Sequence, residues 1–223
     1  MSFLKIARFT IPVFMGYVPL GMAFGLMAVK SGIDWQYALM MSVFIYAGSA
    51  QFLSVTLLAV QTPFFAIFIA IFLLNLRHFF YGLSMINDFK PLKGAAKKYA
   101  IFALTDETFA LLKTLDVPKQ DKTKTFLLIT FLNQTYWVIG TLMGAFLGEN
   151  LAFNAKGIEF CLTALFVVLG IELYKKERAS TPLVISLAIG FLAIWLFPAS
   201  NMLVISLLLC VSSLVLFRKR IEK

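Results

Sequence analysis

The chain has 223 residues, of which 61% are hydrophobic and 14% are charged, and its formal net charge is +9. Soluble domains average about 25% charged residues, so this composition excludes an ordinary water-soluble enzyme and indicates an integral membrane protein. The positive residues stand in short loops between apolar runs, where they act as topology signals, so no nucleic-acid partner is expected. The bilayer is the expected partner surface.

Long apolar runs predict an all-α, polytopic membrane bundle of about seven to eight segments in one domain, residues 1–223, because a barrel would show short alternating strands. A spanning helix needs about 20 apolar residues, so the last two segments are near the limit. The fourth is a poor span, since it carries Lys97, Lys98, Asp106 and Glu107. The segments are Phe9–Val29, Trp35–Val60, Pro63–Ile86, Ala95–Leu112, Phe126–Leu147, Ile158–Tyr174, Pro182–Phe197 and Met202–Phe217.

The first segment contains Tyr17, Pro19, Gly21 and Gly25. Proline removes a backbone donor and kinks or unwinds a helix, whereas a GxxxG pair lets two helices approach closely. The segment is therefore either a kinked packing face or a discontinuous helix. In the second case its freed amides would bind a carboxylate, since half-helix N-termini carry partial positive charge.

The second segment holds four small residues at its centre, Ala47–Ala50, with polar Ser49 and Gln51 among and beside them. Such a run predicts a helix break near Gly48. One interpretation is hydrogen bonding between helices at a tight crossing. The other is a broken helix that exposes its amides and carbonyls to a substrate.

The third segment places Asn75, Arg77, His78 and Tyr81 inside an apolar run. A charged side chain near the bilayer centre costs at least about 2.5–3.5 kcal/mol, so Arg77 needs a carboxylate, a carbonyl or a substrate. Helical spacing puts Asn75 and His78 on one face, and Arg77 and Tyr81 on the neighbouring face. One histidine without a cysteine cluster does not predict a metal site, and no cofactor is expected.

Two acids in the fourth segment, Asp106 and Glu107, are the candidate partners. They are expected to pair with Arg77 or His78, or to take part in a proton relay. The alternative is an interfacial helix whose acids are solvated. Asn133 in the fifth segment adds an amide that can hydrogen-bond inside the bundle.

Basic residues leave two topologies open. Both termini carry positive charge, which predicts that both are cytoplasmic. If every segment crosses, the loop with Lys90 and Lys93 lies outside, against the positive-inside rule. If the second segment enters and leaves on the same side, that loop becomes cytoplasmic and the fourth segment dips in or lies at the interface.

A weak repeat favours the full-span alternative. Thr62-Pro63 opens the third segment and Thr181-Pro182 opens the seventh, 119 positions later. This offset suggests repeats over 1–115 and 120–223. Transporters often carry such duplications, with the substrate site at the repeat interface.

Several motifs, in order and in spacing, resemble the AzlC family of branched-chain amino acid permeases. They are Gly16–Gly25, Tyr46–Phe52, Asn75–Ser84 and Leu104–Ala110, with a weaker match at Thr163–Val168. The resemblance implies export of valine, leucine, isoleucine or their analogues across the bacterial inner membrane. It also implies a small membrane partner subunit of the AzlD type.

Together these observations predict a secondary exporter of neutral amino acids rather than an enzyme. Interrupted segments one and two would hold the substrate through backbone groups, Ser49 and Gln51, beside a polar core that includes Arg77. Proton coupling is an open option. The rivals are a channel lined by the same residues and a non-transporting assembly subunit. The candidate residues for substrate binding or translocation are Tyr17, Pro19, Gly21, Gly48, Ser49, Gln51, Asn75, Arg77, His78, Tyr81, Asp106, Glu107 and Asn133.

Overall fold

The computed structural model describes residues 2–115, 117–150, 167, 171, 180–197 and 199–216. In these residues all regular structure is helical, which confirms the all-α prediction for the described part of the chain. Helices α1, α4 and α7 are long and apolar enough to cross a membrane, while α3 and α9 are shorter apolar helices. The helices are α1 (Phe3–Lys30), α2 (Trp35–Phe44), α3 (Gly48–Ala59), α4 (Phe64–Ser84), α5 (Gly94–Phe102), α6 (Asp106–Thr114), α7 (Lys119–Asn150), α9 (Ser180–Leu196) and α10 (Ala199–Leu216).

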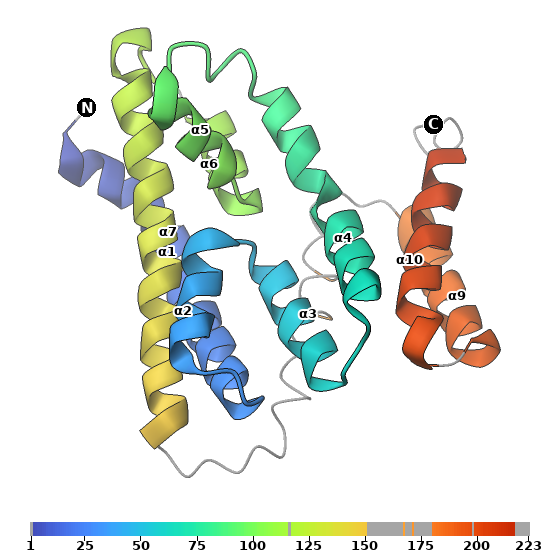
Figure 1. The fold of residues 1–223 in the computed structure, drawn as a ribbon. Helices are drawn as coiled ribbons and strands as arrows, with labels where there is room; N and C mark the ends of the chain where they lie inside the picture. The colour runs from blue at the N-terminus through green and yellow to red at the C-terminus, as the bar shows by residue number, and fades with distance from the viewer. Residues whose placement is uncertain are drawn as a thin grey trace. The chain divides into compact units, whose positions relative to one another are not determined.

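The chain divides into two compact units. One comprises Met1–Ala59 and Asn75–Phe153, and the other comprises Val60–Leu74 and Asn154–Lys223. Within the second unit, α9 and α10 pack against each other (Figure 1). The predicted sixth segment lies outside the described residues, apart from positions 167 and 171. The number of crossing segments and the repeat therefore stay predictions.

In the first unit, α1 packs along α7 in parallel, through glycines on both helices. A Cβ atom built on Gly21 would lie 2.7 Å from a backbone oxygen of α7, and one built on Gly140 would lie 2.5 Å from the carbonyl oxygen of Val18. At Gly25 and Gly144 a Cβ would overlap the opposing backbone outright. Only glycine lets the two backbones approach this closely, so the GxxxG pair is a packing face.

Helix α1 runs unbroken through Pro12 and Pro19, so the prediction of a discontinuous first segment is wrong. Both prolines are exposed, while Gly21 and Gly25 on the same helix are buried. Spanning helices tolerate proline because neighbouring helices and local adjustments satisfy the freed backbone groups. Contact with α7 along the length of α1 holds the helix together past each missing hydrogen bond.

The second predicted segment consists of two helices, α2 and α3, separated at Ile45–Ala47. Tyr46 has a φ of 44°, a left-handed value that few residues other than glycine adopt. From this break α3 runs back in the opposite sense to α2 (Figure 1). With 10 and 12 residues the helices are about 15 and 18 Å long, too short to cross a hydrocarbon core of about 30 Å. The predicted break at Gly48 is confirmed.

The fourth predicted segment is also interrupted. Helices α5 and α6 have nine residues each and are separated at Ala103–Thr105. The end of α6 returns to the loop before α5, where Lys113 Nζ donates to the Ser84 carbonyl at 3.0 Å and to Asp88 Oδ2 at 2.8 Å. The α5–α6 hairpin therefore enters and leaves the unit at one end.

A hydrophobic core at that end joins the start of α1, the loop after α4, the α5–α6 hairpin and the start of α7. Because α1 and α7 both begin here, the basic residues at their starts share this end with Lys90 and Lys93. The α2–α3 hairpin follows the opposite end of α1. The same-side alternative requires this arrangement, with the basic residues at one end and the α2–α3 hairpin at the other. The buried core residues are Ile6, Met85, Phe89, Leu92, Ala100, Leu104, Leu112, Phe126 and Ile129.

Candidate functional site

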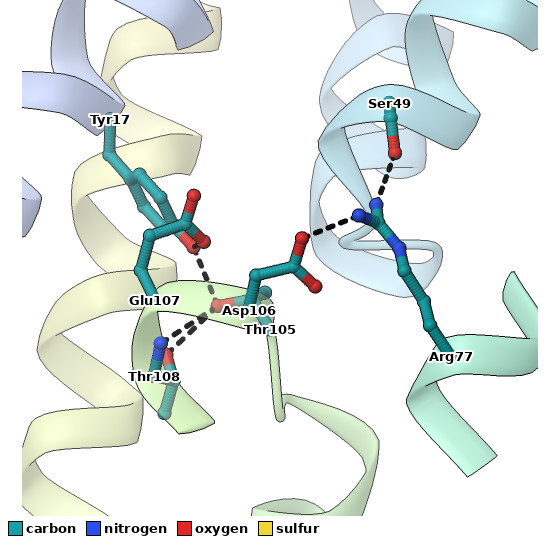
Figure 2. A network of polar contacts seen from close by, with 7 residues as sticks. All are labelled: Tyr17, Ser49, Arg77, Thr105, Asp106, Glu107 and Thr108. Atoms are coloured by element: carbon teal, nitrogen blue, oxygen red, sulfur yellow. Dashed lines mark hydrogen bonds and ion pairs between the residues drawn. The ribbon is translucent and has the colours of Figure 1, made fainter. Parts of the chain in front are cut away.

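The two helix breaks bring the first turns of α3 and α6 toward Arg77 of α4 (Figure 2). Arg77 Nη1 donates to Asp106 Oδ2 at 2.5 Å, and Arg77 Nη2 donates to Ser49 Oγ at 2.6 Å. The predicted pairing of Arg77 with an acid of the fourth segment is confirmed. The side chains of Arg77 and Asp106 are 37% and 36% exposed, so the pair is accessible rather than sealed in the core.

Although Asp106 and Glu107 are adjacent, their carboxylates face different partners (Figure 2). Asp106 points to α4, whereas Glu107 Oε2 accepts a 2.6 Å hydrogen bond from the hydroxyl of Tyr17 on α1. The same hydroxyl lies 2.6 Å from Thr105 Oγ1. Among the described residues Glu107 forms no ion pair. Neighbouring acids thus have different hydrogen-bond partners.

Local sequence determines where α6 begins. Thr105 is the N-cap, in extended conformation, and its Oγ1 accepts from the Thr108 amide at 3.3 Å. Asp106 and Glu107 occupy the first turn and complement the positive end of the helix dipole, while Lys113 complements the negative end. A threonine followed by two acids is a helix-start signal that sequence reasoning could have used to find Thr105.

Helix α7 supports this region with amides. Asn133 is fully buried, and its Nδ2 donates to Thr108 Oγ1 at 2.9 Å. The next residue, Gln134, accepts from the hydroxyl of Tyr99 at 2.7 Å. Trp137, one turn further on, packs edge-on against the Tyr17 ring, with centroids 5.5 Å apart. The polar turn of the fifth segment therefore positions the α5–α6 hairpin and Tyr17.

Gln51 belongs to a second polar group, the buried ladder, which joins α2, α3 and α7. Gln51 Nε2 donates to Ser42 Oγ and Gln51 Oε1 accepts from Trp137 Nε1, both at 3.0 Å. Ser42 lies 2.8 Å from Thr141 Oγ1. A Cβ on Gly48 would lie 2.9 Å from the Trp137 ring. Gln51 and Gly48 therefore occupy the interhelical positions that were the alternative to substrate contact.

The remaining candidates on α4 lie beside the ion pair. The His78 ring contacts the edge of Tyr81 at 5.9 Å between centroids, and Tyr81 stacks on Phe109 of α6 at 4.6 Å. Helix α4 thus contacts α6 through an aromatic stack as well as through charge. Pro19 and Gly21 lie elsewhere on α1, as part of its exposed and packing faces.

Several buried polar atoms have no hydrogen-bond partner among the described residues. An unpaired buried group costs about 1–3 kcal/mol, so such atoms call for an explanation such as a water or ligand. The unpartnered atoms are Tyr46 Oη, Asn75 Oδ1, Arg77 Nε, Asp106 Oδ1, Thr130 Oγ1 and Asn133 Oδ1. Sequence reasoning did not select Tyr46, although its position at the small-residue break was a signal.

Among the described residues no group of three His, Cys, Asp or Glu could hold a metal ion.

The chain is a polytopic helical membrane protein. It has long apolar helices, two segments that are each broken into a helical hairpin, and a charged network at the breaks. Interrupted helices of this kind are typical of transporter substrate sites. The family model described as AzlC protein matches residues 12–151. The chain belongs to the AzlC family, and the resemblance seen in its motifs is confirmed.

Relatives extend over nearly the whole chain. The branched-chain amino acid transport protein AzlC of Bacillus subtilis (strain 168) is 35% identical over 217 residues, 96% of this chain and 85% of that protein. An uncharacterized membrane protein of Helicobacter pylori (strain J99) is 41% identical over 215 residues, 96% of this chain and 93% of the relative. The inner membrane protein YgaZ of Escherichia coli (strain K12) is 27% identical over 185 residues, 80% and 76% of the two chains. No solved structure matches the chain significantly.

Proposed function

We propose that this chain is the transport subunit of a secondary exporter of branched-chain amino acids in the bacterial inner membrane. The observation that supports the proposal most is the approach of the α3 and α6 first turns to Arg77. The name of the Bacillus subtilis relative, a branched-chain amino acid transport protein, supports the substrate class. Together they link a polar membrane site to a neutral, aliphatic substrate.

The carboxylate of the amino acid binds at Arg77. The free N–H groups in the first turn of α3 carry partial positive charge, and Ser49 lies in that turn. Arg77 donates one hydrogen bond to Ser49 and one to Asp106, and its Nε has no partner among the described residues. An incoming carboxylate takes up this free donor and competes with Asp106 for the charge.

The two hairpins provide the alternating access that an exporter needs. The α2–α3 hairpin follows one end of α1, and the α5–α6 hairpin packs at the other end. Both contribute to the network around Arg77. Movement of one hairpin at a time opens that network to one side of the membrane only, as in transporters with sites at broken helices.

The proposal has three further parts. They are a small membrane partner subunit of the AzlD type, the proton gradient as the energy source for export, and cytoplasmic N- and C-termini. The family resemblance supports the partner. The acids beside Arg77 supply groups that can carry a proton through a membrane protein. Helix α6 holds both of these acids in its first turn.

The test uses cells that express the chain with its small partner and are loaded with a valine-containing dipeptide. Intracellular valine should fall faster than in cells with an empty vector, and an uncoupler should abolish the difference. Unchanged valine contradicts the proposal. Uncoupler-resistant release down a gradient indicates a channel, and an assembled but inactive wild-type complex indicates an assembly subunit.

A further inference from the structure

We infer that Glu107, Tyr17, Tyr46 and Asn133 form the binding site for the ammonium group of the substrate, beside the Arg77 site that takes its carboxylate. This inference rests on the proposed function, because it assigns the second charged end of the same amino acid. These four residues are called the ammonium site below.

The Glu107 carboxylate forms no ion pair among the described residues. Asp106 forms an ion pair with Arg77, and Asp88 forms ion pairs with two lysines. Glu107 has only the Tyr17 hydroxyl as a hydrogen-bond partner among the described residues. Acids inside membrane proteins usually face a polar cavity and pair with a cation. Glu107 is exposed, so a cation can reach it.

Two buried residues that are linked to Glu107, electrostatically or through hydrogen bonds, carry unpartnered oxygens. Tyr46 is 3% exposed and interacts electrostatically with Glu107, yet its hydroxyl has no hydrogen-bond partner among the described residues. Asn133 is fully buried, and its Oδ1 is likewise unpartnered. An ammonium group brings three donors and no acceptor, which is the complement that a carboxylate and unpartnered oxygens require.

A short chain of hydrogen bonds links Asn133 to the carboxylate. Asn133 Nδ2 donates to Thr108 Oγ1 at 2.9 Å, and Thr108 Oγ1 lies 3.0 Å from Thr105 Oγ1. Thr105 Oγ1 lies 2.6 Å from the Tyr17 hydroxyl, which donates to Glu107. Tyr17, Glu107 and Asn133 therefore belong to one connected cluster, held by α1, α6 and α7, and Tyr46 lies at the α2–α3 break.

Glu107 of the ammonium site is next in sequence to Asp106, which forms the ion pair with Arg77. An amino acid carries both charges on one carbon atom, so its two binding sites must be neighbours. Asp106 and Glu107 are consecutive, with one side chain directed to Arg77 and the other to Tyr17 (Figure 2). The free donor on Arg77 and the free acceptors near Glu107 have the opposite polarities that a zwitterion requires.

The experiment uses the full-length chain, purified with its small partner subunit in lipid nanodiscs, and measures binding of three probes by calorimetry. The probes are leucine, 4-methylpentanoate, which lacks the ammonium group, and 3-methylbutylamine, which lacks the carboxylate. Glu107→Gln should weaken leucine binding about 10–100-fold, the range expected for losing hydrogen bonds to a charged group. It should leave 4-methylpentanoate binding unchanged. Glu149→Gln, at the far end of α7, is the matched control and should bind all three as the wild type does.

Tyr46→Phe provides a second variant if Glu107→Gln does not fold, and it should weaken leucine binding by about threefold to tenfold without affecting 4-methylpentanoate. Unchanged leucine affinity in either folded variant overturns the inference and leaves the proposed function standing. Loss of pH dependence with unchanged affinity in Glu107→Gln would make Glu107 a proton carrier instead. A wild type that binds no leucine overturns both the inference and the proposed function.

Discussion

The buried ladder and the Arg77 network lie a few residues apart on α3, yet they differ in how completely their polar atoms are satisfied. In the ladder, Gln51 meets Ser42 and Trp137, and all three are buried. In the network, Arg77 and Asp106 are more than a third exposed and each retains a buried atom without a described partner. Satisfied polar groups specify packing, whereas unsatisfied buried ones call for a partner such as a water or a ligand.

The largest effect is expected from Arg77→Ala. Among the described residues Arg77 is the only charged donor of the network, and the substitution removes both of its hydrogen bonds. Transport should fall by at least about tenfold, since hydrogen bonds to charged groups contribute about 1.5–3 kcal/mol. The measurement is valine efflux, with complex assembly followed by size-exclusion chromatography. Arg77→Lys should retain part of the activity, because one ammonium replaces a two-pronged guanidinium. Loss of assembly in Arg77→Ala would assign Arg77 a structural role.

Cysteine labelling tests whether the two hairpins open from opposite ends. Lys93→Cys lies in the loop before α5, and Ser31→Cys follows the opposite end of α1. A membrane-impermeant reagent added outside intact cells should label Ser31→Cys and leave Lys93→Cys unlabelled, because basic loops remain cytoplasmic. Labelling of Lys93→Cys from outside would reject the same-side topology.

Glycine substitutions should damage the packing that supports both polar regions. Gly25→Ala places a Cβ against the α7 backbone, and overpacking costs about 1–3 kcal/mol or more. The melting temperature and the folded yield should both fall. Gly16→Ala on the same helix is the control, since a Cβ there would meet nothing within 4 Å. Equal stability of the two variants would contradict the close approach of α1 and α7.

A paired comparison on α3 separates the ladder from the network directly. Gln51→Ala should lower stability by about 1–3 kcal/mol, because it leaves Ser42 and Trp137 without their shared partner, while the folded fraction keeps its substrate affinity. Ser49→Ala should do the reverse, weakening leucine binding with little change in melting temperature. If the two variants exchange these effects, the division into packing and binding groups is wrong.

The smallest effect is expected at Asp88, outside the membrane helices. Hydrogen bonds from Lys113 and Lys122 lower the pKa of Asp88. Its stabilising contribution is therefore complete above the ordinary carboxyl pKa of about 3.9 and is lost as the pH falls through the lowered value. Asp88→Asn should cost less than about 1 kcal/mol near neutral pH, because the ion pairs are partly exposed, and should remove this pH dependence. Equal acid sensitivity of both proteins would contradict the assignment.

Local chemistry accounts for the features that could be predicted from the sequence. The small residues at Ala47–Ala50 and the need of Arg77 for a counter-charge both follow from neighbours in the chain and from the bilayer as solvent. Prediction failed at Pro19, because contact with α7 holds α1 in one helix where the local rule expects a break. Gly140 and Gly144 of α7 have the same spacing as Gly21 and Gly25 of α1. This second GxxxG pair was a sequence signal for the close contact between the two helices.

Sequence alone determined that the chain is a helical membrane protein of the AzlC family, with a broken second segment and a charge that requires a partner. Only the tertiary structure decided which acid meets Arg77 and which meets Tyr17, since adjacent residues in a helix turn point about 100° apart and their partners come from distant segments. It also decided that Gln51 packs while Ser49 bonds to Arg77. Side-chain directions depend on how helices dock, and short-range sequence patterns do not contain that information.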